Sequence, residues 1–189
     1  MAKVAEQHKT GQTFTVTGRQ LTVSDPCYGT DVWCMGEIDN VMPGKWRARA
    51  LHTDDGAVAA LLVHHEAYDI AALENSEVND ADGDFGVDSA QFGFFDSAKY
   101  PTDGFPGDTY EVIWEMTRCE GGGFGIHNEI GAVAASGYGD GSYPVVTFNC
   151  DDQTVGAMVI FVVEGDSPEF LGDVYSPTAV ARSYLTELL

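Results

Sequence analysis

KWRARALHTDDGAVAALLVHHE, residues 45–66, is the stretch of the sequence that decides the expected fold. Trp46, Ala48 and Ala50 alternate with three basic residues, so apolar side chains lie on one face of a strand and charges on the other. The Asp54-Asp55-Gly56 segment that follows is typical of a tight hairpin turn, and the apolar run after it supplies a partner strand. We therefore expect an antiparallel hairpin here.

Working outward from this hairpin, short apolar or alternating runs predict further strands. They lie at residues 13–16, 20–23, 85–95, 110–117, 130–135, 143–148 and 155–163. Residues 66–78 have modest helical character, and the acidic run at residues 79–84 is expected to be a loop. Ser176 and Pro177 are typical of a helix start, so a short helix is predicted at the C-terminus.

These elements predict a mainly β fold, an antiparallel β-sandwich or curled sheet with a short C-terminal helix. The chain has 189 residues, 44% of them hydrophobic, which suits a single core. We expect residues 1–12 to form a flexible polar tail and residues 13–189 to form one β-rich domain. The 22 glycines are scattered along the chain, which favours many turns over long helices.

Charge is distributed unevenly along the chain. The formal net charge is −21, and residues 50–189 contain 25 acidic but only three basic residues. This balance disfavours direct binding to nucleic acid or to an anionic membrane, because both would repel the protein. Three interpretations stay open: solubility or adaptation to a salty cytoplasm, cation binding, and mimicry of nucleic acid toward a basic partner.

Other motifs in the sequence are weak or absent. No apolar run is long enough to cross a bilayer and the N-terminus lacks a signal-peptide pattern, so we expect a cytoplasmic protein, in the host cytoplasm if a phage encodes it. The four cysteines lack a C-x-x-C spacing, which favours reduced thiols, although a Cys27–Cys34 bridge stays open. Nothing in the sequence identifies a base for a Cys27 nucleophile.

One acidic segment is spaced like a calcium-binding loop. Asp80, Asp82, Asp84 and Asp88 fall at positions 1, 3, 5 and 9 of an EF-hand-like loop. The match is incomplete, because Phe85 replaces the glycine of the sixth position and Gln91 replaces the glutamate of the twelfth. Calcium or another divalent cation is the candidate ligand, and a solvated acidic loop is the alternative.

A second acidic set is spread over three separate turns. Asp25, Asp88 and Asp140 each lie at the end of a predicted strand, where a sandwich gathers its loops. If these ends meet, the three carboxylates could recruit a divalent ion or support acid–base hydrolysis, with Asp84 or Asp96 assisting. The alternative is that each aspartate only organises its own turn through hydrogen bonds.

The order of four short motifs resembles a family of uncharacterised bacterial and phage proteins. The motifs are Gly18 with Asp25-Pro26, Gly44-x-Trp46, Gly86-Val87-Asp88-Ser89-x-Gln91-x-Gly93-x-Phe95-Asp96, and Ser136-Gly137-x-Gly139-Asp140-Gly141-x-Tyr143. The similarity spans residues 11–163 and implies a shared mainly β fold and a shared site, with no established activity. Ala90 departs from the glycine that the resemblance leads us to expect, which puts the geometry of that turn in doubt.

Taken together, these features predict a non-enzymatic acidic binding or interaction protein, a phage or bacterial accessory protein with a divalent cation as a candidate ligand. A basic host protein is the expected partner. Two alternatives stay open: a divalent-metal-dependent hydrolase using Asp25, Asp88 and Asp140, and an acidic nucleic-acid mimic that inhibits a host protein.

Overall fold

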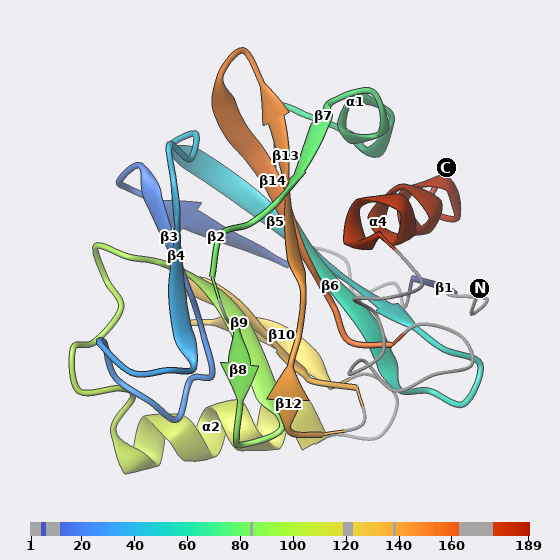
Figure 1. Cartoon of the computed structure of the whole chain (residues 1–189). Coiled ribbons are helices and arrows are strands. Elements are labelled where there is room, and N and C mark those ends of the chain that lie inside the picture. Colours follow the sequence, from blue (N-terminus) through green and yellow to red (C-terminus); the bar gives the residue numbers. More distant parts are fainter. Residues whose placement is uncertain (1–4, 7–11, 84, 119–122, 138, 163–175) are drawn as a thin grey trace.

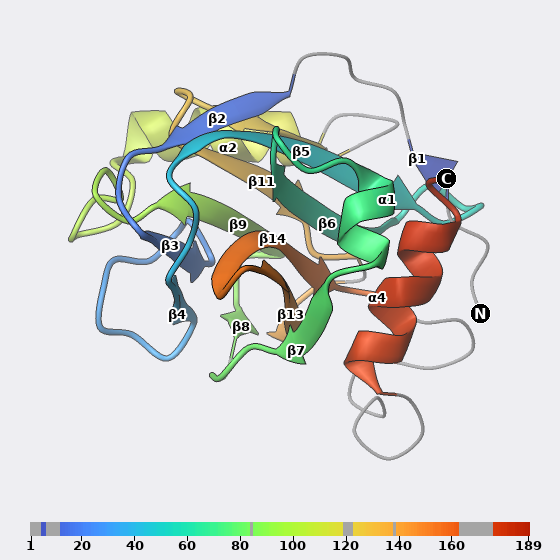
Figure 2. The ribbon, with the colours of Figure 1, turned by 90° about the horizontal axis from the view of Figure 1, so that it is seen from above.

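The computed structural model describes residues 5–6, 12–83, 85–118, 123–137, 139–162 and 176–189. They form two antiparallel sheets packed against each other, with helices on the outside (Figures 1 and 2). The mainly β, antiparallel fold class with a short C-terminal helix is therefore confirmed.

The larger sheet has the strand order β1-β5-β6-β14-β13-β7, and β2 also pairs with β5. Its strands are β1 (Ala5–Glu6), β2 (Thr13–Val16), β5 (Gly44–His52), β6 (Val58–His65), β7 (Glu77–Asp80), β13 (Val145–Cys150) and β14 (Gln153–Ile160). The β5–β6 pair is the predicted hairpin, with Trp46 opposite His65 and Gly56 at φ +90° in the turn. A positive φ in a hairpin turn is the conformation that glycine adopts without a steric penalty.

The smaller sheet has the order β10-β11-β9-β3-β4. Its strands are β3 (Gln20–Ser24), β4 (Met35–Asp39), β9 (Gln91–Asp96), β10 (Phe124–His127) and β11 (Gly131–Ala135). A third, two-stranded sheet pairs β8 (Gly86–Val87) with β12 (Gly141–Ser142). β7 is thus a terminal strand of the larger sheet and β4 a terminal strand of the smaller one.

Strand β9 contributes to both hydrophobic clusters of the described residues. Phe92 and Phe94 face the main core between the sheets, whereas Phe95 faces the opposite side. There Phe95 packs in a second cluster with Tyr100, Ile113 and Val133. This alternation follows from the two-residue period of a strand, and it shows that β9 is covered on both faces.

In the described part of the chain, three helices lie on the outer faces of the sheets: α1 (Ile70–Glu74), α2 (Gly107–Arg118) and α4 (Pro177–Thr186). α2 covers β10 and β11, while α4 packs against α1, β7, β13 and β14 on the far side of the molecule (Figures 1 and 2). The predicted C-terminal helix is confirmed, with Ser176 as its N-cap residue. None of the helices in the described ranges is long and apolar enough to cross a membrane.

The strand predicted at residues 110–117 is wrong, because this segment lies inside α2. Ile113 and Thr117 are buried against the sheet, at a spacing of four residues that fits a helix and not a strand. Asp108 in the first turn and Arg118 in the last turn also favour a helix, since both charges complement the helix dipole.

The loop predicted at residues 79–84 is wrong at its start. Asn79 and Asp80 belong to β7, where they pair with Thr147 and Val146. Asp84, the last residue of the predicted loop, lies outside the described residues. Within the predicted N-terminal tail, Ala5 and Glu6 form β1 and pair with β5.

Candidate functional site

The Asp25 side chain is fully buried where the chain leaves β3. One carboxylate oxygen accepts hydrogen bonds from the Cys27 N–H at 2.9 Å and the Ser89 hydroxyl at 2.7 Å. The other oxygen accepts from the N–H groups of Asp88 at 2.9 Å and Ser89 at 2.7 Å. Asp25 therefore joins the turn at residues 25–28 to the turn at residues 88–90, with about four lone-pair sites taken by four donors.

We call this contact between residues 25–28 and 88–90 the Asp25 junction. Asp88 lies on its exposed side. Its Oδ2 accepts a hydrogen bond from the Tyr28 hydroxyl at 2.5 Å. This bond, more than burial or the other nearby charges, raises the pKa of Tyr28, because ionising the phenol would place two negative charges together. Tyr28 therefore stays a neutral donor at physiological pH.

Asp140 completes the junction from the loop between β11 and β12. Its Oδ1 accepts from the Ala90 N–H at 2.9 Å. Ala90 has a φ of +57°, a left-handed conformation that glycine adopts more readily than alanine. The side chain of Asp140 bonds the backbone N–H of this strained turn, at the position where the resemblance led us to expect glycine.

The three predicted catalytic aspartates thus lie on turns that contact each other, and each carboxylate bonds a neighbouring turn. Across the ranges that the structure describes, no three His, Cys, Asp or Glu side chains are grouped so that they could hold a metal ion. Asp96, the other candidate, lies buried at the far end of β9 and accepts from the Thr17 hydroxyl at 2.7 Å. The hydrolytic role of these residues stays a prediction.

A thiol lies beside the junction. Cys27 is exposed and bonds the side chain of Tyr110 on α2. Partial burial raises the pKa of Cys27, and the nearby charges of Asp25 and Asp88 raise it further, while the bond from Tyr110 lowers it. Since only the thiolate is a strong nucleophile, this environment disfavours thiol catalysis at neutral pH. Cys34 and Cys150 are also free thiols, whereas Cys119 lies outside the described residues.

Gln91 is the first residue of β9 and is buried, with 2% of its surface exposed. Its Nε2 donates to the Tyr110 hydroxyl at 2.8 Å, and its Oε1 is buried without a hydrogen-bond partner among the described residues. Tyr110 and Gln91 thus tie α2 to the Asp25 junction. The sequence did not point to this pair, because the segment that contains Tyr110 was predicted to be a strand.

The residues predicted to bind calcium are divided between two places. Asp80 and Asp82 line a cavity at the end of β7, whereas Asp88 bonds Tyr28 at the Asp25 junction. Asp80 is held in a strand that pairs with β13, so the first position of the predicted loop has strand geometry. Asp84 lies outside the described residues, and the calcium site stays a prediction.

The cavity at the end of β7 has a volume of about 250 Å³ and is lined by residues of β4 and of the chain that leaves β7. It is lined by Glu37, Ile38, Asp39, Asp80, Ala81, Asp82, Thr147 and Thr154. We call it the acidic groove, since four of its eight lining residues are carboxylates and none is basic. Gln20 donates to Glu37 at 2.9 Å and to Asp39 at 3.0 Å, which fixes both carboxylates on the outer face of β4.

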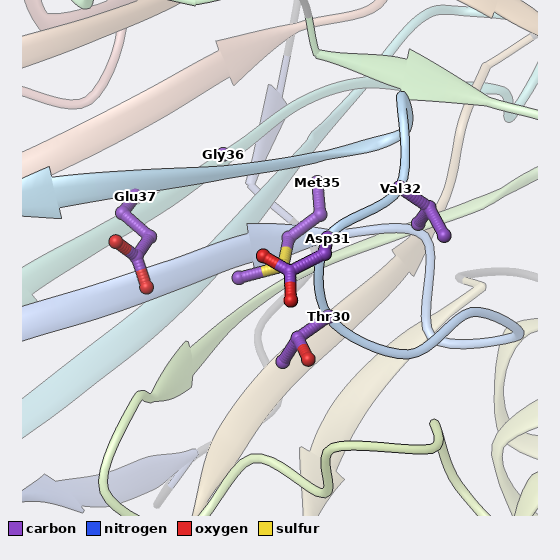
Figure 3. Close-up of a pocket in the computed structure, with 6 residues that line it drawn as sticks. All are labelled: Thr30, Asp31, Val32, Met35, Gly36 and Glu37. Carbon is purple, nitrogen blue, oxygen red and sulfur yellow. The ribbon is translucent and has the colours of Figure 1, made fainter.

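A second cavity of 420 Å³ lies at the start of β4 and is lined by Thr30, Asp31, Val32, Met35, Gly36 and Glu37. We call it the loop cavity. The side chains of Asp31, Met35 and Glu37 point to the same side of β4 and of the loop before it (Figure 3). Glu37 lines both cavities, so the loop cavity and the acidic groove follow one another along β4.

β4 was missed from the sequence, although Met35-Gly-Glu-Ile-Asp39 has a detectable signal. Ile38 is buried between exposed Glu37 and Asp39, the alternation typical of a strand with one face in the core. The importance of these two carboxylates became visible only when β7 brought Asp80 and Asp82 to the opposite side of the groove.

Comparison of the chain with protein-family models, with curated proteins and with solved structures found no match.

Proposed function

We propose that the protein is a non-enzymatic binding module that recognises a basic partner protein through the acidic groove. The observation that supports this function is the convergence of Glu37 and Asp39 from β4 with Asp80 and Asp82 from β7 and its C-terminal end. A groove lined by carboxylates without a basic residue attracts cationic groups and increases the rate of encounter with a basic surface.

The composition of the groove favours a protein partner. Ile38 and Ala81 supply apolar wall, while Thr147 and Thr154 supply hydroxyl groups. Apolar contact together with peripheral charge is the usual composition of a protein interface. Proteins that bind DNA or RNA present basic segments of this kind, so the nucleic-acid-mimic alternative is a special case of this proposal.

The hydrogen bonding of Asp25 supports binding over hydrolysis. A general base or metal ligand needs a lone pair directed at the substrate or the ion. The four donors to Asp25 use its acceptor capacity within the protein. The groove carboxylates Asp80 and Asp82, in contrast, are exposed to solvent.

The test is calorimetric titration of the protein with an acetylated and amidated octapeptide of alternating lysine and threonine. At about 100 mM salt, where the Debye length is about 10 Å, neutralising the groove should weaken binding by about tenfold or more, since each ion pair contributes on the order of 1 kcal/mol. The groove variant carries Glu37→Gln, Asp39→Asn, Asp80→Asn and Asp82→Asn.

The matched control removes the same number of charges from exposed positions elsewhere. It carries Asp54→Asn, Glu111→Gln, Glu115→Gln and Glu187→Gln, all on exposed residues. This control should change the affinity by less than about twofold, because exposed charges separated by more than a Debye length are screened. Equal losses in the two variants would show that the peptide responds to net charge alone, and the proposed function would be wrong.

A further inference from the structure

The outer edge of β4 is a strand edge without a partner strand among the described residues. β4 is the last strand of its sheet and, among the described residues, pairs with β3 alone. Its open edge ends at Asp39, where Thr154 bonds the backbone of Asp39 and Asn40. Both the acidic groove and the loop cavity lie along it and share Glu37. An unpaired strand edge presents backbone donors and acceptors that can bind another extended chain.

The direction of the backbone groups can be followed along β4. In an antiparallel pair, successive residues direct their N–H and C=O groups alternately toward and away from the neighbouring strand. The Met35 N–H donates to the Val32 carbonyl at 3.1 Å, and the Asp39 carbonyl accepts from the Thr154 hydroxyl at 3.4 Å, so both residues direct these groups away from β3.

Glu37 lies midway between Met35 and Asp39 and has the same orientation. Its N–H and C=O therefore point to the open edge, where no group of the described chain bonds them. This pair of free backbone groups lies at the residue that the two cavities share. The edge offers hydrogen bonds at the place where the carboxylates offer charge.

We propose that an extended segment of the basic partner adds as a strand to the edge of β4, and that it inserts one lysine or arginine side chain into the loop cavity. This inference rests on the proposed function and specifies how the partner is held. In this binding mode the backbone hydrogen bonds supply affinity, while the pockets for alternate side chains supply specificity.

The lining of the loop cavity fits a long cationic side chain. Asp31 and Glu37 supply two carboxylates for the charged end, and Val32 and Met35 supply apolar surface for the methylene stem. Trp33, between these residues in sequence, is 60% exposed, and its ring lies against Gly86. Its fluorescence therefore provides a probe of binding beside this cavity.

The negative charge along β4 favours a basic segment over a second copy of this chain as the added strand. Pairing two β4 edges would bring Glu37 and Asp39 of one copy close to the same residues of the other, and facing like charges are destabilising. Acidic residues at a strand edge thus oppose self-association. The same residues attract a lysine-containing strand.

The backbone hydrogen bonds can be tested with two N-methylated forms of the lysine–threonine octapeptide, which keep its charge. One form is methylated on the lysine amides and the other on the threonine amides, so each blocks a different edge of an extended chain. We expect one form to bind at least about tenfold more weakly than the parent, and the other to bind as the parent does. Equal affinities of the two forms, whether both unchanged or both reduced, would overturn strand addition.

Hydrogen exchange gives an independent measurement on the protein. At a parent peptide concentration about ten times Kd, exchange of the Glu37 and Asp39 amides should slow by about tenfold, because only the free protein leaves them open. Unchanged exchange at both amides would contradict strand addition. Asp31→Asn should weaken binding about threefold to tenfold, and the fold should be kept because asparagine tolerates the positive φ of Asp31. The control Asp54→Asn, in the exposed turn between β5 and β6, should leave the affinity unchanged. Equal affinities of these two variants would contradict the role of the loop cavity.

The two proposals can fail separately. If the groove variant loses binding selectively but both N-methylated forms bind equally, the acidic groove is the docking surface and strand addition is wrong. If the groove variant and its control bind equally, the proposed function itself is wrong.

Discussion

Asp25 combines full burial with four hydrogen bonds to its carboxylate. The donors come from residues two positions and more than sixty positions away in the sequence. A buried carboxylate is tolerated only when such donors replace the water that it loses on folding. At the scale of single residues, Asp25 is therefore a structural side chain that fixes two turns, and the exposed groove carboxylates are the ones available to a ligand.

The substitution Asp25→Asn tests this structural role. Asparagine retains one acceptor oxygen and directs an NH2 group at donors that previously met an oxygen, so we expect a loss of about 3 kcal/mol in the free energy of unfolding. Urea unfolding followed by circular dichroism measures this loss. Asp88→Asn is the control, because the exposed Asp88 carboxylate accepts one hydrogen bond from the described residues, that of the Tyr28 hydroxyl, and the substitution should cost less than about 1 kcal/mol. An unchanged midpoint for Asp25→Asn would contradict the structural role.

At the scale of elements, α2 shows how a helix can be mistaken for a strand. Tyr110, Ile113 and Thr117 recur at spacings of three and four residues and face the smaller sheet. Strand-like alternation of Val112, Trp114 and Met116 is present in the same residues. Ile113 separates the two patterns, because it belongs to the buried face only if the segment is helical.

The pair Ile113→Ala and Val112→Ala distinguishes the two structures. Ile113 is 0% exposed among Phe95, Tyr100 and Val133, so its truncation should cost about 2–4 kcal/mol through lost packing and the cavity left behind. Val112 is 52% exposed, and its truncation should cost less than about 0.5 kcal/mol. Thermal and urea unfolding measure both costs. A larger cost at Val112 than at Ile113 would favour the strand.

At the scale of the whole molecule, charge opposes folding. The formal net charge of −21 leaves many carboxylates without a basic neighbour, and compaction brings them closer together. The described ion pairs lie at few places, such as Lys45 and Arg47 with Glu66, where they join β5 to the residue after β6. The remaining repulsion depends on ionic strength.

Salt should therefore stabilise the protein. Between about 10 mM and 500 mM sodium chloride, the Debye length falls from about 30 Å to below 5 Å, and we expect the Tm to rise by about 5 °C. Differential scanning calorimetry measures this rise. The control variant with four fewer carboxylates should show a smaller rise, because it has less repulsion to screen. A Tm that stays constant or falls with salt would be incompatible with net repulsion in the folded state.

Elements with a local sequence signal could be predicted, whereas contacts between residues far apart in the sequence could not. The β5–β6 hairpin and α4 were predicted correctly, because Asp55-Gly56 and Ser176-Pro177 are local signals that act within a few residues. Asp25, Asp88 and Asp140 were expected to be neighbours because each lies at a predicted strand end, and the strand ends of a sandwich gather its loops. The hydrogen-bond partners of these aspartates could not be predicted, since Asp25 bonds Ser89 across 64 positions and Asp140 bonds Ala90 across 50.

The sequence by itself determined the mainly antiparallel β character, the C-terminal helix and the acidity, because side-chain periodicity, turn chemistry and charge are properties of short segments. Only the tertiary structure decided that residues 107–118 are a helix, that β4 and β7 are terminal strands, and that their carboxylates line one groove. Such facts depend on which distant surfaces pack together, and burial between those surfaces outweighs local preference.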